Sequence, residues 1–311
     1  MIANGEVSDL EKPSGEPGHS GKVAAPSASA YGKNRIGVAT PIYFVVSAAF
    51  HYMGPTFAVL LFARLNYLGV AWLRIATAAL VFLIWTRPWR YIKGFDLRTR
   101  ILVVSLGLVL AAMNVSFYTA ISKLPLGTVA AIEFLSPIGL AVVGTRTSRN
   151  LVSMLLAVTG VYTLARVTFT SNMSGYLFAF ANCILFGLYI VLGHKLASEG
   201  GPSGIERISA SMCVAFLVVS PVGIVFVRPA LSHPSWLLAG LGVGICSSVI
   251  PYACDQMAMA RLGRSTFAFF LAILPATASL MGAAILRQIP TFHELLGIAL
   301  VTVGVATHSQ N

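Results

Sequence analysis

The sequence has few charged residues. Asp, Glu, Lys and Arg make up only 10% of its 311 residues, whereas 57% are hydrophobic and the mean hydropathy is +0.82. Because a soluble domain averages roughly a quarter charged residues, a soluble fold is excluded for most of the chain. The net charge of +11 does not indicate nucleic-acid binding, since the basic residues lie in short connectors without an aromatic-basic groove.

The sequence also lacks the common motifs of catalysis and metal binding. It contains no HExxH, no GxSxG and no Gly-rich phosphate loop after a strand. The four cysteines, Cys183, Cys213, Cys246 and Cys254, lie in apolar runs without the spacing of a metal site. We therefore expect no enzyme activity, no disulfide, no metal and no cofactor.

Long apolar runs are abundant instead. Residues 1–34 are rich in Gly, Ser, Pro and Ala and predict a disordered tail. Beyond them, runs of about twenty residues recur, each long enough to cross ~30 Å of hydrocarbon as a helix. The fold class expected is an all-α, polytopic membrane protein with ten transmembrane helices. The predicted spans are 38–60, 67–86, 101–122, 126–144, 150–167, 175–194, 207–227, 235–258, 265–286 and 292–308.

The distribution of Lys and Arg predicts the orientation. With the tail in the cytoplasm, 15 of the 21 basic residues fall on the inner side, 5 on the outer side and one, Arg74, within a span. Basic residues collect in cytoplasmic loops, so both termini are expected to be cytoplasmic.

Two segments resemble each other at a fixed offset. Residues 123–144 align with 261–282, which matches Pro137 with Pro275 and Gly144 with Gly282. Five helices per half give the halves opposite orientations, so we predict an inverted repeat, a symmetry of alternating-access transporters. The predicted repeats are residues 35–167 and 168–311. The paired prolines indicate helix breaks near the bilayer midplane, although each alone is equally compatible with a packing kink.

Ionisable residues within spans are costly and are candidates for a functional site. His51, Arg74 and Glu133, together with Asn114, lie roughly 13 to 20 Å below the outer connector charges at 1.5 Å per residue. We predict that these side chains form one polar layer, in which Arg74 binds a substrate carboxylate and Glu133 binds an ammonium group or a proton. Alternatively, Arg74 and Glu133 form a buried ion pair that only fixes helix packing, and His51 and Asn114 only bond across helices.

Asp255 is the fourth ionisable residue within a span. It lies six residues before Arg261 and so about two turns from the inner surface, near Tyr252 and Gln256. It is expected either to be a second titratable site along the path or to reach the cytoplasmic interface, pairing there with Arg261 or Arg264.

Three stretches together resemble a known family. They are LRIATAALVFLIWTRPWR, AAMNVSFYTAISKLPLGTVAAIEFLSPIGLAVV and IPYACDQMAMARLGRSTFAFFLAILPATASLMGAAI. The chain resembles the threonine/homoserine exporter branch of the drug/metabolite transporter superfamily, which carries the EamA-type repeat twice, over residues 40–306. The resemblance implies ten helices, cytoplasmic termini and proton-coupled efflux of small metabolites. The residues that match the family pattern are Arg74, Asn114, Tyr118, Glu133 and Pro137.

The chain departs from that pattern in its second half. Leu274 stands before Pro275 where the branch often has Glu, Arg287 and Gln288 replace a Gly-Glu pair, and Asp255 stands where the branch can carry Glu. The chain therefore lacks the ninth-helix carboxylate of that branch but keeps a carboxylate at Asp255.

The function expected is proton-coupled efflux of small, threonine- or homoserine-like amino acids across a bacterial inner membrane. The partners expected are a small-molecule substrate, protons and the lipid bilayer, without nucleic acid, and a homodimer is left open. The alternatives are export of another metabolite or drug, or a membrane sensor that does not transport.

Overall fold

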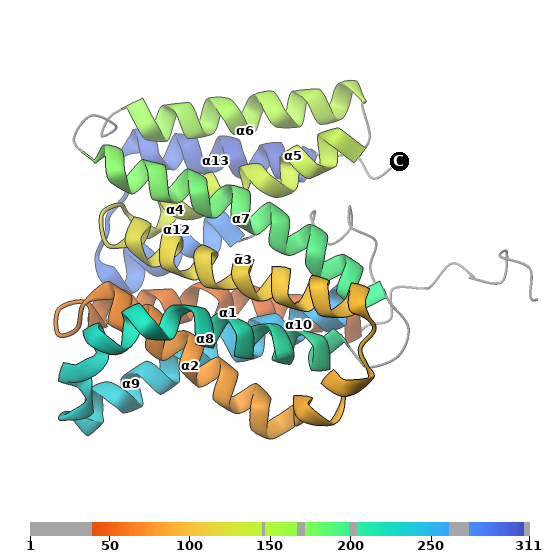
Figure 1. Cartoon of the computed structure of the whole chain (residues 1–311). Coiled ribbons are helices and arrows are strands. Elements are labelled where there is room, and N and C mark those ends of the chain that lie inside the picture. Colours follow the sequence, from red (N-terminus) through yellow and green to blue (C-terminus); the bar gives the residue numbers. More distant parts are fainter. Residues whose placement is uncertain (1–38, 145–146, 167–171, 199–203, 261–273, 308–311) are drawn as a thin grey trace, which may run out of the picture. The chain divides into compact units, whose positions relative to one another are not determined.

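A computed structural model describes residues 39–144, 147–166, 172–198, 204–260 and 274–307 (Figure 1). All regular elements within these residues are helical. The predicted tail, residues 1–34, and the basic residues Arg261 and Arg264 lie outside the described residues.

The helices follow the predicted apolar runs. Their bounds are α1 Ala39–Leu61, α2 Tyr67–Thr86, α3 Leu97–Ile121, α4 Leu126–Glu133, α5 Leu135–Gly144, α6 Ser148–Arg166, α7 Met173–Ser198, α8 Gly204–Leu231, α9 Pro234–Gly244, α10 Ile250–Met259, α12 Leu274–Leu286 and α13 Phe292–Thr307. Two short 3-10 helices, η2 Pro88–Arg90 and η3 Ile92–Gly94, connect α2 to α3, and a π-helical turn, η4 Ile245–Val249, joins α9 to α10.

Several helical segments are long and apolar enough to cross a bilayer unaided. The five among the described residues are Tyr67–Thr86, Leu97–Ile121, Met173–Ala197, Gly204–Leu231 and Pro234–Met259, and shorter apolar helices accompany them. The chain is therefore an all-helical, multi-pass membrane protein. The number of ten spans and the inverted repeat stay predictions.

The predicted span 126–144 is interrupted, and the predicted span 235–258 contains the π-helical turn η4. The run 126–144 forms two helices, because α4 ends at Glu133 and α5 begins at Leu135. Pro137 has no N–H to donate to the Glu133 carbonyl four residues earlier, which weakens the helix at this point. Pro275 is the second residue of α12, and the residues before 274 lie outside the described part.

The connection between α2 and α3 carries charged residues at a membrane boundary. The Asp96 carboxylate accepts a hydrogen bond from the Thr99 backbone N–H at 3.1 Å and caps α3. The hydrogen bonds from Thr99 hold the pKa of the Asp96 carboxyl below its usual value. This end of α3 is therefore stabilised by a charged cap outside the apolar span.

Helices distant in sequence pack side by side. Helix α6 packs along α13, α3 along α7, α2 along α8, and α1 along α10 and α12 (Figure 1). The α6–α13 contact is especially close: a Cβ added at Gly160 would lie 2.6 Å from the Gly297 carbonyl oxygen, and one at Gly304 would lie 2.8 Å from that of Ser153. Glycine is needed there because the backbones approach within a side chain's width.

Candidate functional site

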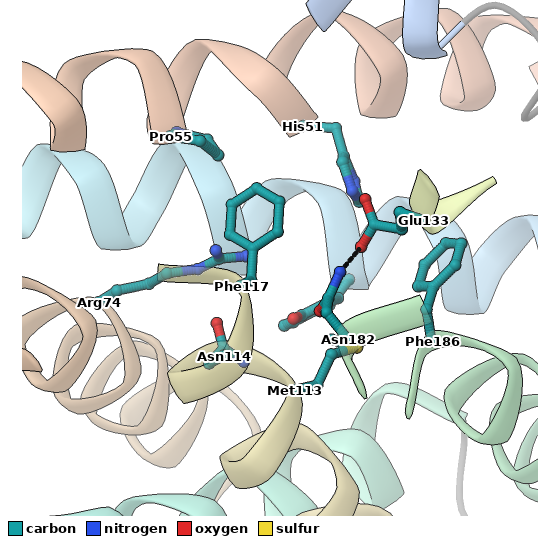
Figure 2. Close-up of a pocket in the computed structure, with 10 residues that line it drawn as sticks. His51, Pro55, Arg74, Met113, Asn114, Phe117, Glu133, Asn182 and Phe186 are labelled. Carbon is teal, nitrogen blue, oxygen red and sulfur yellow. Dashed lines mark hydrogen bonds between the residues drawn. The ribbon is translucent and has the colours of Figure 1, made fainter. Parts of the chain in front are cut away.

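A buried pocket, here called the central pocket, lies where six helices meet. The lining residues are His51 and Pro55 of α1, Arg74 of α2, Met113, Asn114 and Phe117 of α3, Glu133 of α4, Asn182 and Phe186 of α7, and Tyr252 of α10 (Figure 2). The four residues of the predicted polar layer are therefore brought together in one place. Figure 2 shows the Arg74 and Glu133 side chains entering it from opposite sides.

Arg74 is held by the π-helical turn η4. Its Nε donates to Ser248 Oγ at 2.7 Å and its Nη2 donates to the Ser247 carbonyl oxygen, also at 2.7 Å. Pro251 lies four residues after Ser247 and has no N–H, so it cannot donate the regular helical hydrogen bond to that carbonyl. The freed carbonyl is one of the two acceptors that fix the guanidinium.

An aromatic ring supports Arg74 from another direction. The Arg74 Cζ lies 5.4 Å from the centre of the Tyr118 ring, within the range of a cation–π contact. Tyr118 is fully buried but does not line the central pocket. Its place in the structure is therefore to position Arg74 rather than to border the space.

Glu133 is bonded by neutral donors. Tyr52 of α1 donates its hydroxyl to Oε2 at 2.8 Å, and Asn182 of α7 donates its Nδ2 to Oε1 at 2.9 Å (Figure 2). No ion pair joins Glu133 to Arg74 among the residues that the structure describes. The opposite charges thus share the pocket without a direct contact, unlike the ion pair considered as an alternative.

Several buried polar atoms around the pocket have no hydrogen-bond partner among the described residues. The Asn114 Nδ2 donates to the Leu110 carbonyl at 2.7 Å, which leaves Asn114 Oδ1 unpaired. Asn182 Oδ1 and the hydroxyls of Tyr118 and Tyr252 are unpaired as well. A buried polar group without a partner costs free energy. The three such groups that line the pocket, Asn114 Oδ1, Asn182 Oδ1 and the Tyr252 hydroxyl, therefore indicate a surface prepared for a polar ligand.

The pocket is closed by tight helix packing. A Cβ at Gly54 of α1 would lie 2.3 Å from Ser247 Cβ, and one at Gly244 would lie 2.4 Å from Thr77 Cβ of α2. The cavity of the central pocket has a volume of about 20 Å³, little more than one water molecule requires. An amino acid can enter this pocket only if the helices separate.

Two other predicted residues lie outside the central pocket. Asp255 is 2% exposed, and its oxygens accept from Ser47 Oγ at 2.7 Å and from the Tyr189 hydroxyl at 3.2 Å. It therefore does not extend to the interface. Gln256 is also buried and lies near Gly193 of α7 and Gly204 of α8.

Sequence reasoning missed five side chains that shape these sites: Tyr52, Asn182, Ser248, Ser47 and Tyr189. Asn182 had a usable signal, because it is a polar amide in the middle of a predicted span, as Asn114 is. The serines and tyrosines had none, since such residues are common in membrane helices as packing donors.

The fold is known from a solved structure. A crystal structure is similar to it with a TM-score of 0.57 at 16% identity, over 86% of this chain and 96% of that one. Together with the apolar helices, the buried polar pocket is typical of a membrane transporter.

Comparison with known proteins shows an EamA-like domain in the second half of the chain and two similar exporters. Residues 173–309 match the EamA-like transporter family. The threonine/homoserine exporter RhtA of Salmonella typhimurium is 29% identical over 80% of this chain and 83% of its own, and that of Escherichia coli K12 is 28% identical over 84% and 88%. The chain is a multi-pass membrane transporter with an EamA-like domain, which confirms the resemblance predicted from the sequence.

Proposed function

We propose that this protein exports small zwitterionic amino acids, such as threonine and homoserine, in exchange for protons. The observation that carries the proposal is that Arg74 and Glu133 line one buried pocket without pairing with each other. A zwitterion has complementary charges at its two ends, so it fits a pocket with one cation and one anion.

The other polar atoms of the central pocket also favour a zwitterionic substrate. The unpaired Asn114 Oδ1 and Asn182 Oδ1 are acceptors, and an ammonium group offers only donors. The Tyr252 hydroxyl can donate or accept and is free for either end of the ligand or its side chain. The names of the similar proteins, threonine/homoserine exporter, agree with a substrate of this size and charge.

Proton coupling is assigned to Glu133. Its two donors, Tyr52 and Asn182, are neutral, so no fixed cation is bonded to the carboxylate. Protonation of Glu133 would weaken the hold on the ammonium group and release the amino acid. The cycle proceeds by alternating access, in which two inverted five-helix halves rock around the pocket in the bacterial inner membrane, with ten spans and both termini in the cytoplasm.

The experiment that tests this function is a panel of metabolites in proteoliposomes with an imposed pH gradient. We expect uptake or release of threonine and homoserine that stops when the gradient is collapsed, and weak effects of organic acids and amines that lack one of the two charges. If a neutral or cationic drug is transported and amino acids are not, the substrate class proposed is wrong.

A further inference from the structure

A second buried carboxylate lies beside the central pocket without lining it. The Asp255 side chain of α10 is 2% exposed. Ser47 of α1 donates to its Oδ1 at 2.7 Å, and Tyr189 of α7 donates to its Oδ2 at 3.2 Å. We call Asp255, Ser47 and Tyr189 the Asp255 site, and Glu133, Tyr52 and Asn182 the Glu133 site.

The two sites are built on the same pair of helices. In each, one carboxylate oxygen is bonded from α1 and the other from α7. Each site also contains one tyrosine hydroxyl, from α1 at Glu133 and from α7 at Asp255. The carboxylates themselves come from different helices, α4 and α10, so the arrangement is shared although the sequence positions are not.

The order of the donors separates the two sites along the helices. On α1, Ser47 donates to Asp255 and lies five residues before Tyr52, which donates to Glu133. On α7, Tyr189 donates to Asp255 and lies seven residues after Asn182, which donates to Glu133. The helices are therefore antiparallel here. At 1.5 Å per residue the two sites lie about 8 to 10 Å apart along the helix axes.

The Asp255 site accommodates a carboxyl group in either protonation state. A carboxylate only accepts, whereas a protonated carboxyl also donates, so its neighbours must be able to reverse roles. Ser47 and Tyr189 are both hydroxyls and do so by rotating one O–H bond. At the Glu133 site Tyr52 can reverse in the same way, whereas Asn182 must turn its whole amide group over to present its Oδ1 as an acceptor.

No basic side chain is hydrogen-bonded to Asp255 in the described part of the chain. A buried carboxylate without a bonded cation is costly, and taking up a proton removes that cost. The packed helices also carry other titratable groups, none of which, apart from Tyr189, is hydrogen-bonded to Asp255 among the described residues. They are His51 and Tyr52 of α1, Tyr176, Cys183, Tyr189, His194 and Lys195 of α7, Glu206, Arg207, Cys213 and Arg228 of α8, Cys246 of η4, and Tyr252 and Cys254 of α10 itself.

We propose that Asp255, Ser47 and Tyr189 form a second proton-binding site, next to the substrate pocket. The Tyr189 ring lies 5.5 Å from the Tyr252 ring, and Tyr252 lines the central pocket, so the two tyrosines connect the sites. The step is one protonation of an aspartate oxygen by water-derived H⁺, with no change of oxidation state. The link of this proton to transport rests on the proposed function, but the existence of the site does not.

The test is infrared titration of the purified, lipid-reconstituted protein, which detects the carbonyl stretch of a protonated carboxyl group. The wild type is expected to show one band that disappears in Asp255→Asn and a different one that disappears in Glu133→Gln. Asp96→Asn is the matched control, because Asp96 is an exposed helix cap and Asn also caps helices; it should leave both bands in place.

Two milder variants keep the proposal testable if the Asp255→Asn protein does not fold. Tyr189→Phe and Ser47→Ala keep the carboxyl group and should shift the frequency and midpoint of the Asp255 band. If the Asp255→Asn spectrum equals that of the wild type at every pH, or if neither milder variant moves the band, the proposal is overturned. The infrared readout needs no transport, so the Asp255 band should be present even if the protein does not export amino acids. Conversely, absence of the band would overturn the second proton site and leave the proposed export untouched.

Discussion

The α6–α13 pair and the central pocket both bring helix backbones into close contact, but with different side chains and different helix geometry. At α6–α13, Gly160 and Gly304 allow contact between two unbroken helices. Around the pocket, Gly54 and Gly244 do the same, yet the helices contain Pro55, a break after Glu133 and a π-helical turn. We call α6 and α13 the scaffold, and we predict that the shape changes of the proposed transport cycle occur in the irregular helices.

The irregularities follow a simple spacing. A proline stands four residues after His51, after Glu133 and after Ser247, so each of these residues loses its regular helical donor. The Ser247 carbonyl is then bonded by Arg74. Broken helices with freed carbonyls mark substrate sites in transporters, whereas α6 and α13 have no proline in their described residues.

The largest effect should follow from Glu133→Gln. Without the Glu133 carboxyl group, pH-driven amino-acid transport in proteoliposomes should fall to the rate of protein-free vesicles. Glu133→Asp, which keeps the charge on a shorter arm, should retain part of it. Intact proton-dependent transport by Glu133→Gln would remove Glu133 from the mechanism and weaken the contrast with α6–α13.

Arg74→Ala should have the next largest effect. Loss of the charged contact to a substrate carboxylate should weaken threonine binding by about 10- to 100-fold, the equivalent of a charged hydrogen bond. Arg74→Lys should recover only part of the affinity, because lysine lacks the planar fork of the guanidinium. The measurement is competition by amino acids in a transport assay, and undiminished competition in Arg74→Ala would contradict the assignment.

A smaller effect is expected for Ser248→Ala. Arg74 would lose the acceptor for its Nε but keep the Ser247 carbonyl for its Nη2. Threonine binding should weaken roughly 3- to 10-fold, as for one ordinary hydrogen bond, and Ser248→Thr should restore it. A loss as large as that of Arg74→Ala would mean that the serine contacts the substrate itself.

The smallest effect on transport should come from Gly160→Ala in the scaffold. The added methyl group would lie 2.6 Å from the Gly297 carbonyl oxygen, and such overpacking costs about 1 to 3 kcal/mol of stability. The melting temperature should fall while the KM for threonine stays at the wild-type value. A changed KM would show that α6 and α13 take part in substrate binding.

The positions of the helices were predictable because hydropathy reports one physical constraint, the length of apolar helix needed to cross the hydrocarbon layer. Every predicted span contains a helix in the described residues. The sequence predicted a helix break at Pro137, but it did not predict the π-helical turn that precedes Pro251. Both prolines were visible in the sequence. Their consequences depend on which neighbouring side chain bonds the freed carbonyl, and that is set by tertiary packing.

The site was predictable in part, for a similar reason. Depth within the membrane placed His51, Arg74, Asn114 and Glu133 in one layer, and the structure brings them to one pocket. The direct partners of Glu133 and Asp255 were not predictable, because Tyr52, Asn182, Ser47 and Tyr189 lie far from them in sequence. The depth of a residue along the membrane normal does not specify which helices are neighbours.

The most direct test of the central claim is a binding cycle that combines a change in the protein with a change in the ligand. The affinities of threonine and threonine methyl ester, which lacks the carboxylate, are measured by calorimetry for the wild type and for Arg74→Ala. If Arg74 binds the carboxylate, the ester should lose affinity for the wild type but not for Arg74→Ala, giving a non-additive cycle. Additive losses would show that Arg74 and the substrate carboxylate do not interact.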